Sequence, residues 1–120
     1  MYLKNTDDIT PITSPHGEIV REYLGKAVGG AQQHSLAQIT LPPGHASRKH
    51  YHPVVEESYL ILSGEGRMVI GHEEQRVRPG DAIAVPVHAI HQIFNTGSTD
   101  LVFLAVCAPP WTPDCSVFID

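Results

Sequence analysis

GHASRKHYHPVVEESYLILSG, residues 44–64, carries His50 and His52 two positions apart, with Glu57 five positions after His52. In an extended strand, residues i and i+2 point to the same face with alpha carbons roughly 6.6 Å apart, so two imidazoles can converge on one point. Glu57 cannot join them on one straight strand, because five extended residues span roughly 17 Å. Pro53 lacks the amide hydrogen that a sheet ladder needs, and it predicts a turn after which the chain returns. The spacing therefore indicates a metal site assembled from two strands.

Residues 57–62 form the expected returning strand, and both of its faces are mostly apolar. One face carries Glu57, Tyr59 and Ile61, and the other carries Ser58, Leu60 and Leu62. Two apolar faces are typical of a strand that is covered on both sides. Glu56 is the competing ligand, but the face shared with Tyr59 favours Glu57, so Glu56 is expected in solvent at the start of the strand.

A second segment, GDAIAVPVHAIHQIFN at residues 80–95, supplies a fourth candidate ligand in His91. Here Gly80 is followed after five residues by Pro86, and His91 is followed after three residues by Asn95. Fifteen residues separate the two segments.

Together the two segments resemble the two signature motifs of the cupin superfamily. The first motif reads Gly, five residues, His-Xaa-His, three or four residues, Glu, six residues, Gly, and it is matched throughout by Gly44, His50, His52, Glu57 and Gly64. The second reads Gly, five residues, Pro-Xaa-Gly, two residues, His, three residues, Asn, and it is matched by Gly80, Pro86, His91 and Asn95. His88 stands where the last Gly of the second motif is expected. This departure concerns a turn and not the ligand set, so the signal is specific over about half of the chain.

The resemblance implies an all-β fold, a double-stranded β-helix of the jelly-roll type. Short apolar segments recur at intervals of about 8 to 12 residues between Gly and Pro turns, which also indicates a sandwich or barrel. Strands are expected in residues 17–25, 34–41, 82–85, 90–95 and 100–107. A hairpin is expected across Gly64-Glu65-Gly66. No stretch of ten or more residues shows the 3.6-residue period of an amphipathic helix.

The chain length fits one domain. Residues 1–16 contain Thr10-Pro11 and Ser14-Pro15 and are expected to form a loosely ordered N-terminal arm. Residues 17–120 are expected to form a single cupin β-barrel domain.

If His50, His52, Glu57 and His91 converge inside the barrel, they supply three neutral nitrogens and one carboxylate. This set suits a divalent transition metal, because imidazole favours Fe, Ni, Cu and Zn while the hard carboxylate keeps Mn in the set. Four protein ligands leave an octahedral ion two open positions for water, dioxygen or a bidentate substrate. The ion and Glu57 together carry a net charge of about +1, which attracts an anionic oxygen and supports Lewis-acid activation or oxygen chemistry.

Glu57 and His88 are the candidate catalytic residues. Two interpretations of His88 stay open. It is a proton shuttle at the barrel mouth, since histidine titrates near neutrality, or it caps the turn whose usual Gly it replaces. His45, near the start of the first motif, leaves the same two alternatives.

By alternation from Glu57 and His91, the pocket candidates are Tyr59, Ile61 and Ile93. The wall is completed by one of two pairs, depending on a register that the sequence does not fix: Met68 and Ile70, or else Arg67 and Val69. An apolar pocket with few polar groups favours an aromatic or otherwise largely hydrophobic small molecule over a sugar phosphate.

The formal net charge is −5 and the eight Lys and Arg residues are scattered, so nucleic acid is not an expected partner. No run approaches the roughly 18 apolar residues of a membrane helix, and the polar start lacks the apolar stretch of a signal peptide. The chain is therefore expected to be cytoplasmic, with no membrane partner. Cys107 and Cys115 are too few for a disulfide scaffold. Cys107 is interpreted as a small buried hydrophobe, and an interaction between the two cysteines is left open.

A homodimer is expected, because apolar residues on the outward faces of barrel strands meet solvent unless another element covers them. The resemblance implies the same, since small single-domain cupins are often dimers. We expect a divalent-metal-binding cupin that acts as a metal-dependent enzyme, a dioxygenase or an isomerase-like enzyme, on a small organic molecule. The alternative is a non-catalytic cupin barrel that binds or senses a small molecule, and a weaker one is a domain that regulates another protein.

Overall fold

The computed structural model describes residues 1–119, so the last residue of the expected 17–120 domain lies outside the described residues. The elements in chain order are η1 (Thr6–Asp8), β1 (Ile12–Thr13), β2 (Ile19–Leu24), β3 (Ser35–Leu41), β4 (His50–Tyr51), β5 (Glu56–Ser63), β6 (Gly66–Ile70), β7 (Glu73–Val77), β8 (Ala82–Val85), β9 (His91–Asn95), β10 (Leu101–Ala108) and β11 (Val117–Phe118). The single turn of 3-10 helix, η1, is the one helical element in the described range, which confirms the all-β prediction. A helix long and apolar enough to cross a bilayer does not occur in residues 1–119.

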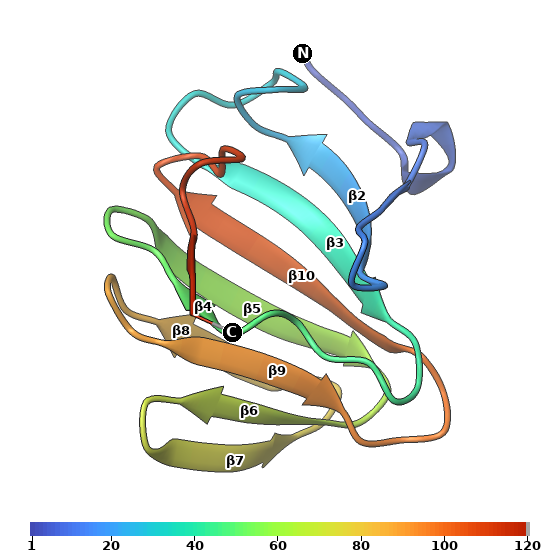
Figure 1. The fold of residues 1–120 in the computed structure, drawn as a ribbon. Coiled ribbons are helices and arrows are strands. Elements are labelled where there is room, and N and C mark those ends of the chain that lie inside the picture. The colour runs from blue at the N-terminus through green and yellow to red at the C-terminus, as the bar shows by residue number, and fades with distance from the viewer. Residues whose placement is uncertain (120) are drawn as a thin grey trace.

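The strands form two antiparallel sheets that face each other (Figure 1). The six-stranded sheet has the order β1-β2-β3-β10-β5-β8, and the five-stranded sheet has the order β11-β4-β9-β6-β7. Strands far apart in the sequence lie side by side, because β10 runs between β3 and β5 while β9 runs between β4 and β6. This arrangement confirms the jelly roll that the resemblance implied.

The core lies between the two sheets and follows from strict alternation along the strands. Both β5 and β10 bury every second residue over most of their length. Ile61 and Phe103 face inward and pair directly across these two strands. Met68 and Ile93 form the facing layer from the five-stranded sheet. Burial of such side chains, at roughly 25 cal/mol per Å² of apolar surface, is the main stabilising contribution to the fold.

The hairpin expected across Gly64-Glu65-Gly66 is wrong. Strands β5 and β6 belong to different sheets, so this turn carries the chain from one sheet to the other. The φ angle of Gly64 is +86°, and a Cβ at this position would collide with the backbone oxygen of Asp100. Glycine alone permits both this conformation and this close approach. The hairpin lies one strand later, between β6 and β7.

The segment expected as an N-terminal arm contributes η1 and the edge strand β1. In β1, Ile12 pairs with Val20 of β2. The hydroxyl of Tyr2 donates a 2.7 Å hydrogen bond to the carbonyl of Val28, which ties the start of the chain to the loop after β2. A domain boundary at residue 16 stays a prediction.

The outward faces of β5 and β10 carry apolar side chains that this chain leaves partly uncovered. Leu60 and Leu62 on β5 are 40% and 43% exposed, and Val106 on β10 is 38% exposed. Within the described chain, the outward face of β5 is therefore only partly covered, in contrast to the two-sided cover expected from its sequence.

Candidate metal centre

Strands β4, β5 and β9 bring the four expected ligands to the space between the sheets. His50 begins β4, His52 follows the end of that strand, and Pro53 starts the turn toward β5, as the sequence predicts. Glu57 is the second residue of β5, where alternation points it inward and leaves it 6% exposed. His91 begins β9 and pairs directly with His50 across the two strands.

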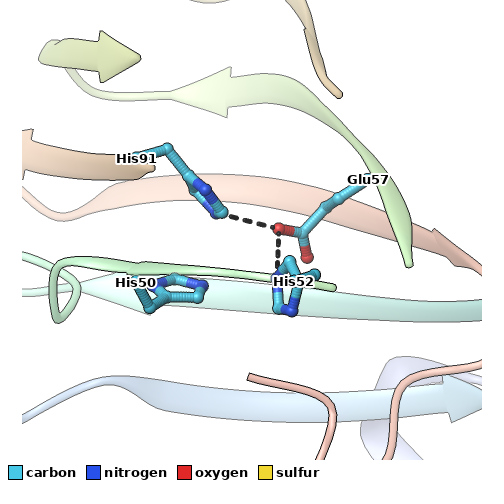
Figure 2. A group of neighbouring side chains, drawn as sticks. All are labelled: His50, His52, Glu57 and His91. Carbon is cyan, nitrogen blue, oxygen red and sulfur yellow. Dashed lines mark hydrogen bonds and ion pairs between the residues drawn. The ribbon is translucent and has the colours of Figure 1, made fainter. Parts of the chain in front are cut away.

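Figure 2 shows the four side chains turned toward one another. One ligand atom from each lies within 4.8 Å of those of the other three. Glu57 Oε1 is 3.3 Å from Nε2 of His52 and 3.3 Å from Nε2 of His91. Two ligands at right angles around an ion, each about 2.1 Å from it, stand roughly 3.0 Å apart. The cluster is therefore close to the size of a coordination shell.

Backbone carbonyls fix the outer nitrogen of each imidazole. The three pairs are His50 Nδ1 with Arg48 O at 2.7 Å, His91 Nδ1 with Ala89 O at 2.9 Å and His52 Nδ1 with Cys115 O at 3.1 Å. A carbonyl only accepts hydrogen bonds, so each Nδ1 carries a proton and donates it. This arrangement turns Nε2 of each ring toward the cluster and leaves it available to a metal ion.

His91 Nε2 is buried and has no hydrogen-bond partner among the described residues, although Glu57 Oε1 is 3.3 Å away. A buried lone pair that faces a carboxylate oxygen is unfavourable unless a proton or cation lies between them. Three imidazole nitrogens with one carboxylate are also a donor set that divalent transition metals accept. The residues present therefore fit a divalent ion, and the cluster of His50, His52, Glu57 and His91 can hold one.

Without metal, the cluster contains an ion pair. Burial opposes ionisation of Glu57, but hydrogen bonds, foremost that with His52, outweigh it and hold the pKa of Glu57 well below its usual range. Burial also opposes charge on His52, but hydrogen bonds with Cys115 and Glu57 raise the pKa of His52 to about 10. Burial and the neighbouring His91 lower the pKa of His50 to about 4. Binding of a metal ion must therefore displace a proton from His52.

Groups that the sequence reading did not assign to the site surround these ligands. The buried Cys107 thiol on β10 donates a 3.1 Å hydrogen bond to Glu57 Oε2. Ser116 Oγ lies 3.3 Å from His52 Nδ1. Glu18, just before β2, is close enough to Glu57 for their charges to interact, and burial raises the pKa of Glu18. The sequence signal for Cys107 was its place in the inward alternation of β10, which places it opposite Glu57 once the strand pairing is known.

The C-terminal segment lies against the cluster. Its strand β11 pairs with β4, so that Phe118 stands opposite His50, with 5.7 Å between the ring centroids. The guanidinium of Arg48 stacks 3.8 Å from the centroid of the Phe118 ring. Cys115 in this segment and Cys107 are both free thiols, and they contact different ligands of the cluster.

His88 has the left-handed conformation for which the second motif normally uses glycine. Its φ angle is +70°, its side chain is exposed, and its N–H donates a 2.9 Å hydrogen bond to the carbonyl of His52. This geometry supports the turn interpretation, while a role of His88 as a proton shuttle stays a prediction. His45 is also exposed, with Nδ1 3.2 Å from the carbonyl of Pro43. Glu56 is exposed as expected.

The pocket candidates Tyr59, Ile61 and Ile93 are all buried in the hydrophobic core. Tyr59 lies nearest the cluster, with its ring centroid 6.3 Å from that of His91. Met68 joins the same core, which resolves the register that the sequence left open. Contact of these side chains with a ligand stays a prediction.

A cavity of about 920 Å³ opens beside the C-terminal segment. Its walls come from residues within 25–32, 53–55 and 109–115. Cys115, whose carbonyl holds His52 Nδ1, is part of the wall. The cavity therefore borders the Nδ1 side of His52, and not the side on which the four ligands converge.

Two facing antiparallel sheets around three histidines and one glutamate are typical of small jelly-roll proteins with an internal cluster of metal-ligand residues. The family model of the cupin domain matches residues 37–107, a range that includes all four cluster residues. This chain belongs to the cupin family.

Individual relatives agree with this assignment. An uncharacterized protein of Methanocaldococcus jannaschii is 35% identical over 106 residues, which cover 88% of this chain and 85% of the relative. An oxalate-binding protein of Thermotoga maritima is 40% identical over 91 residues, which cover 75% of each chain. The crystal structure of a predicted oxalate decarboxylase from Thermotoga maritima matches with a TM-score of 0.78 and 31% identity, covering 89% of this chain and 98% of that one.

Proposed function

We propose that this cupin is a metal-dependent enzyme that binds a small carboxylate, or a related oxyanion, at a divalent ion held by His50, His52, Glu57 and His91. The reaction classes that we propose are oxygen-dependent chemistry of the dioxygenase type and isomerase-like chemistry. The observation that carries the proposal is one ligand atom from each of three histidines and Glu57 within 4.8 Å, with every Nδ1 fixed by a backbone carbonyl.

The charge of the site supports an anionic ligand. A divalent ion supplies Lewis-acid activation when bound, and with Glu57 as the single charged ligand the centre carries a net charge of about +1. Such a centre attracts carboxylates, and oxalate can fill two neighbouring coordination positions at once. The oxalate-binding protein of Thermotoga maritima, at 40% identity, supports this ligand class.

Proton transfer in such an enzyme needs a side chain that can accept and donate a proton. Glu57 does not serve, because its hydrogen bonds keep it ionised. His88 is our candidate, since its exposed side chain stands on the turn that is hydrogen-bonded to the carbonyl of His52. Glu57 then acts in the reaction through the metal alone.

The second candidate function is a non-catalytic barrel that binds or senses a small molecule. It is favoured by the same relative, which is named for binding oxalate and not for converting it. The two functions differ in turnover, because a binding module is stabilised by its ligand but leaves the ligand unchanged.

The test begins with elemental analysis of protein purified without a His-tag or chelator, followed by reconstitution with Mn, Fe, Co, Ni, Cu or Zn. We expect about one ion per chain, and calorimetric binding of oxalate that requires the ion. Product analysis with and without dioxygen then separates the enzyme from the binding module. A chain that takes up no divalent ion under any of these conditions contradicts the metal-dependent enzyme and leaves the binding module, which needs no metal.

We also propose that the functional form is a homodimer. The partly exposed Leu60, Leu62 and Val106 support it, because they lie on outward strand faces that the described chain leaves partly uncovered. An apolar face of this kind is stabilised when a second copy packs against it.

A further inference from the structure

We infer that Cys107 is a positioning residue of the metal centre, whose thiol holds one oxygen of Glu57 so that the carboxylate presents only the other oxygen to the ion. This inference rests on the proposed metal-binding function. It assigns a role to a buried thiol that the ligand set does not use.

The two oxygens of Glu57 have different surroundings. Oε1 faces the imidazoles, 3.3 Å from Nε2 of His52 and 3.3 Å from Nε2 of His91. Oε2 instead accepts the 3.1 Å hydrogen bond from Cys107 Sγ. Cys107 is 3% exposed and Glu57 is 6% exposed, so water does not replace this donor. A buried carboxylate oxygen that loses its donor must find another partner.

The thiol is itself held in place from the other side. Cys107 pairs with Glu57 on β5 and with Ser35 on β3, so it stands between them on one face of the sheet. Ser35 Oγ in turn accepts a 2.9 Å hydrogen bond from the N–H of Trp111. The cross-strand neighbour of Cys107 is therefore itself fixed by the C-terminal segment.

The hydrogen bond from the thiol determines which oxygen of Glu57 is free to bind an ion. While Oε2 accepts the hydrogen bond from the thiol, Glu57 would offer an ion Oε1 alone. When the thiol is removed, Oε2 loses the donor that Cys107 supplies, and an ion in the cluster would compensate its charge. Glu57 then turns toward two-oxygen binding, which fills a position that a ligand would use.

The test compares two variants of Cys107 in the full-length protein loaded with Co(II). Cys107→Ser keeps a hydroxyl donor, whereas Cys107→Val replaces the thiol with an apolar group of similar size. We expect Cys107→Val to lower Co(II) affinity by about 10- to 100-fold, the usual effect of removing a group that orients a metal ligand. Its visible Co(II) spectrum changes in intensity as coordination changes, while Cys107→Ser keeps the spectrum and affinity of the natural protein.

Phe103→Leu is the matched control, because Phe103 is an inward core residue of the same strand that belongs to the hydrophobic core and not to the ligand set. It reports the effect of a weaker core on Co(II) binding and is expected to leave the spectrum unchanged. If Cys107→Val does not fold, Cys107→Ala compared with Cys107→Ser measures the same difference.

Natural affinity and spectrum in Cys107→Val, or an equal loss in Phe103→Leu, overturns this inference while the metal site stands. Failure of the natural protein to bind Co(II) or any other divalent ion overturns the proposed function and this inference with it.

Discussion

The burial and hydrogen bonding of His91 suit this residue to binding a cation. It is almost fully buried, its Nδ1 is bound to a carbonyl two residues earlier in the chain, and its Nε2 faces a carboxylate oxygen without a hydrogen bond. A buried imidazole with a fixed proton on one nitrogen and an unsatisfied atom on the other is suited to a cation.

Replacing His91 with Ala is therefore expected to remove metal binding, with an affinity loss of more than about 100-fold, because a direct ligand matters more than a group that orients one. Metal content per chain after reconstitution and dialysis measures the effect. His72→Ala is the control, since His72 is exposed on the turn between β6 and β7. Equal metal content in the two variants would remove His91 from the ligand set.

The protonation of the metal-free cluster predicts a stability maximum near pH 6.5. His52 has a folded pKa of about 10, above its ordinary value of 6.5, so its contribution is complete below 6.5 and is lost as pH rises toward 10. His50 has a folded pKa of about 4, below its ordinary value of 6.5. As pH falls from 6.5 to 4, the unfolded chain therefore binds more protons than the folded chain, which lowers the stability of the folded state. Stability therefore declines on both sides.

Urea unfolding of chelated protein between pH 4 and 10 measures this profile. We expect the free energy of unfolding to fall by at least roughly 1.4 kcal/mol between pH 7 and 10, the equivalent of one pKa unit. In His52→Gln the alkaline decline is expected to disappear while the acid side remains. A natural protein whose stability is flat from pH 7 to 10 contradicts the ion pair between His52 and Glu57.

For individual residues, the sequence indicated the candidate ligands but not the side chains that contact them. The periodicity of a strand and a turn at Pro53 are local properties, so they were enough to indicate that His50, His52 and Glu57 converge. Cys107 contacts Glu57, which lies 50 positions earlier in the chain, and Ser116 contacts His52, which lies 64 positions earlier. Such contacts follow from strand pairing. No local pattern contains that pairing.

Among the elements, the crossing between β5 and β6 depends most on one backbone position. Gly64→Ala is expected to lower the free energy of unfolding by about 3 kcal/mol, because the left-handed conformation and the collision with Asp100 both oppose a Cβ. Urea denaturation measures the loss. Gly71→Ala is the matched control, since it also has a positive φ but a Cβ there meets nothing within 4 Å. It is expected to lose about 1 kcal/mol, and equal losses in both variants would show that the collision is absent.

The C-terminal segment is predicted to support the metal site through the Cys115 carbonyl. A chain that ends at Thr112 keeps the bond from Trp111 to Ser35 but removes the acceptor for His52 Nδ1. Metal affinity is expected to fall by about 10- to 100-fold. A chain that ends at Phe118 retains the carbonyl and serves as the comparison, with affinity measured by competition against a chelator. Natural affinity in the shorter chain would show that His52 is held without this segment.

Strand existence was predictable because alternation and Gly or Pro turns are read locally, and β3, β8 and β10 fall within one residue of their expected bounds. Strand partners were not, which is why the Gly64-Glu65-Gly66 turn was interpreted as a hairpin. A tight glycine turn fits a hairpin and a crossing between sheets equally well, and only the strand pairing distinguishes them. His88 illustrates the converse, since a turn at the position where the motif has Gly was one of its two interpretations, and its φ angle is +70°.

For the whole molecule, the uncovered outer face predicts association. We expect sedimentation at micromolar concentration to give a particle of two 13.1 kDa chains, and Leu60→Glu to shift it toward the single chain by placing a charge on the exposed apolar face. His72→Glu, on the other sheet, is the control and is expected to sediment like the natural protein. A 13.1 kDa particle for the natural chain contradicts the dimer.

The three carbonyls that orient the imidazoles come from different distances along the chain. His50 and His91 each use a carbonyl two residues before them, whereas His52 uses Cys115, 63 residues later. During synthesis on the ribosome, two rings can thus be oriented by their own strands as soon as these emerge. The third waits until Cys115 has been translated, so a nascent chain cannot complete the centre until 63 residues after His52 have been added.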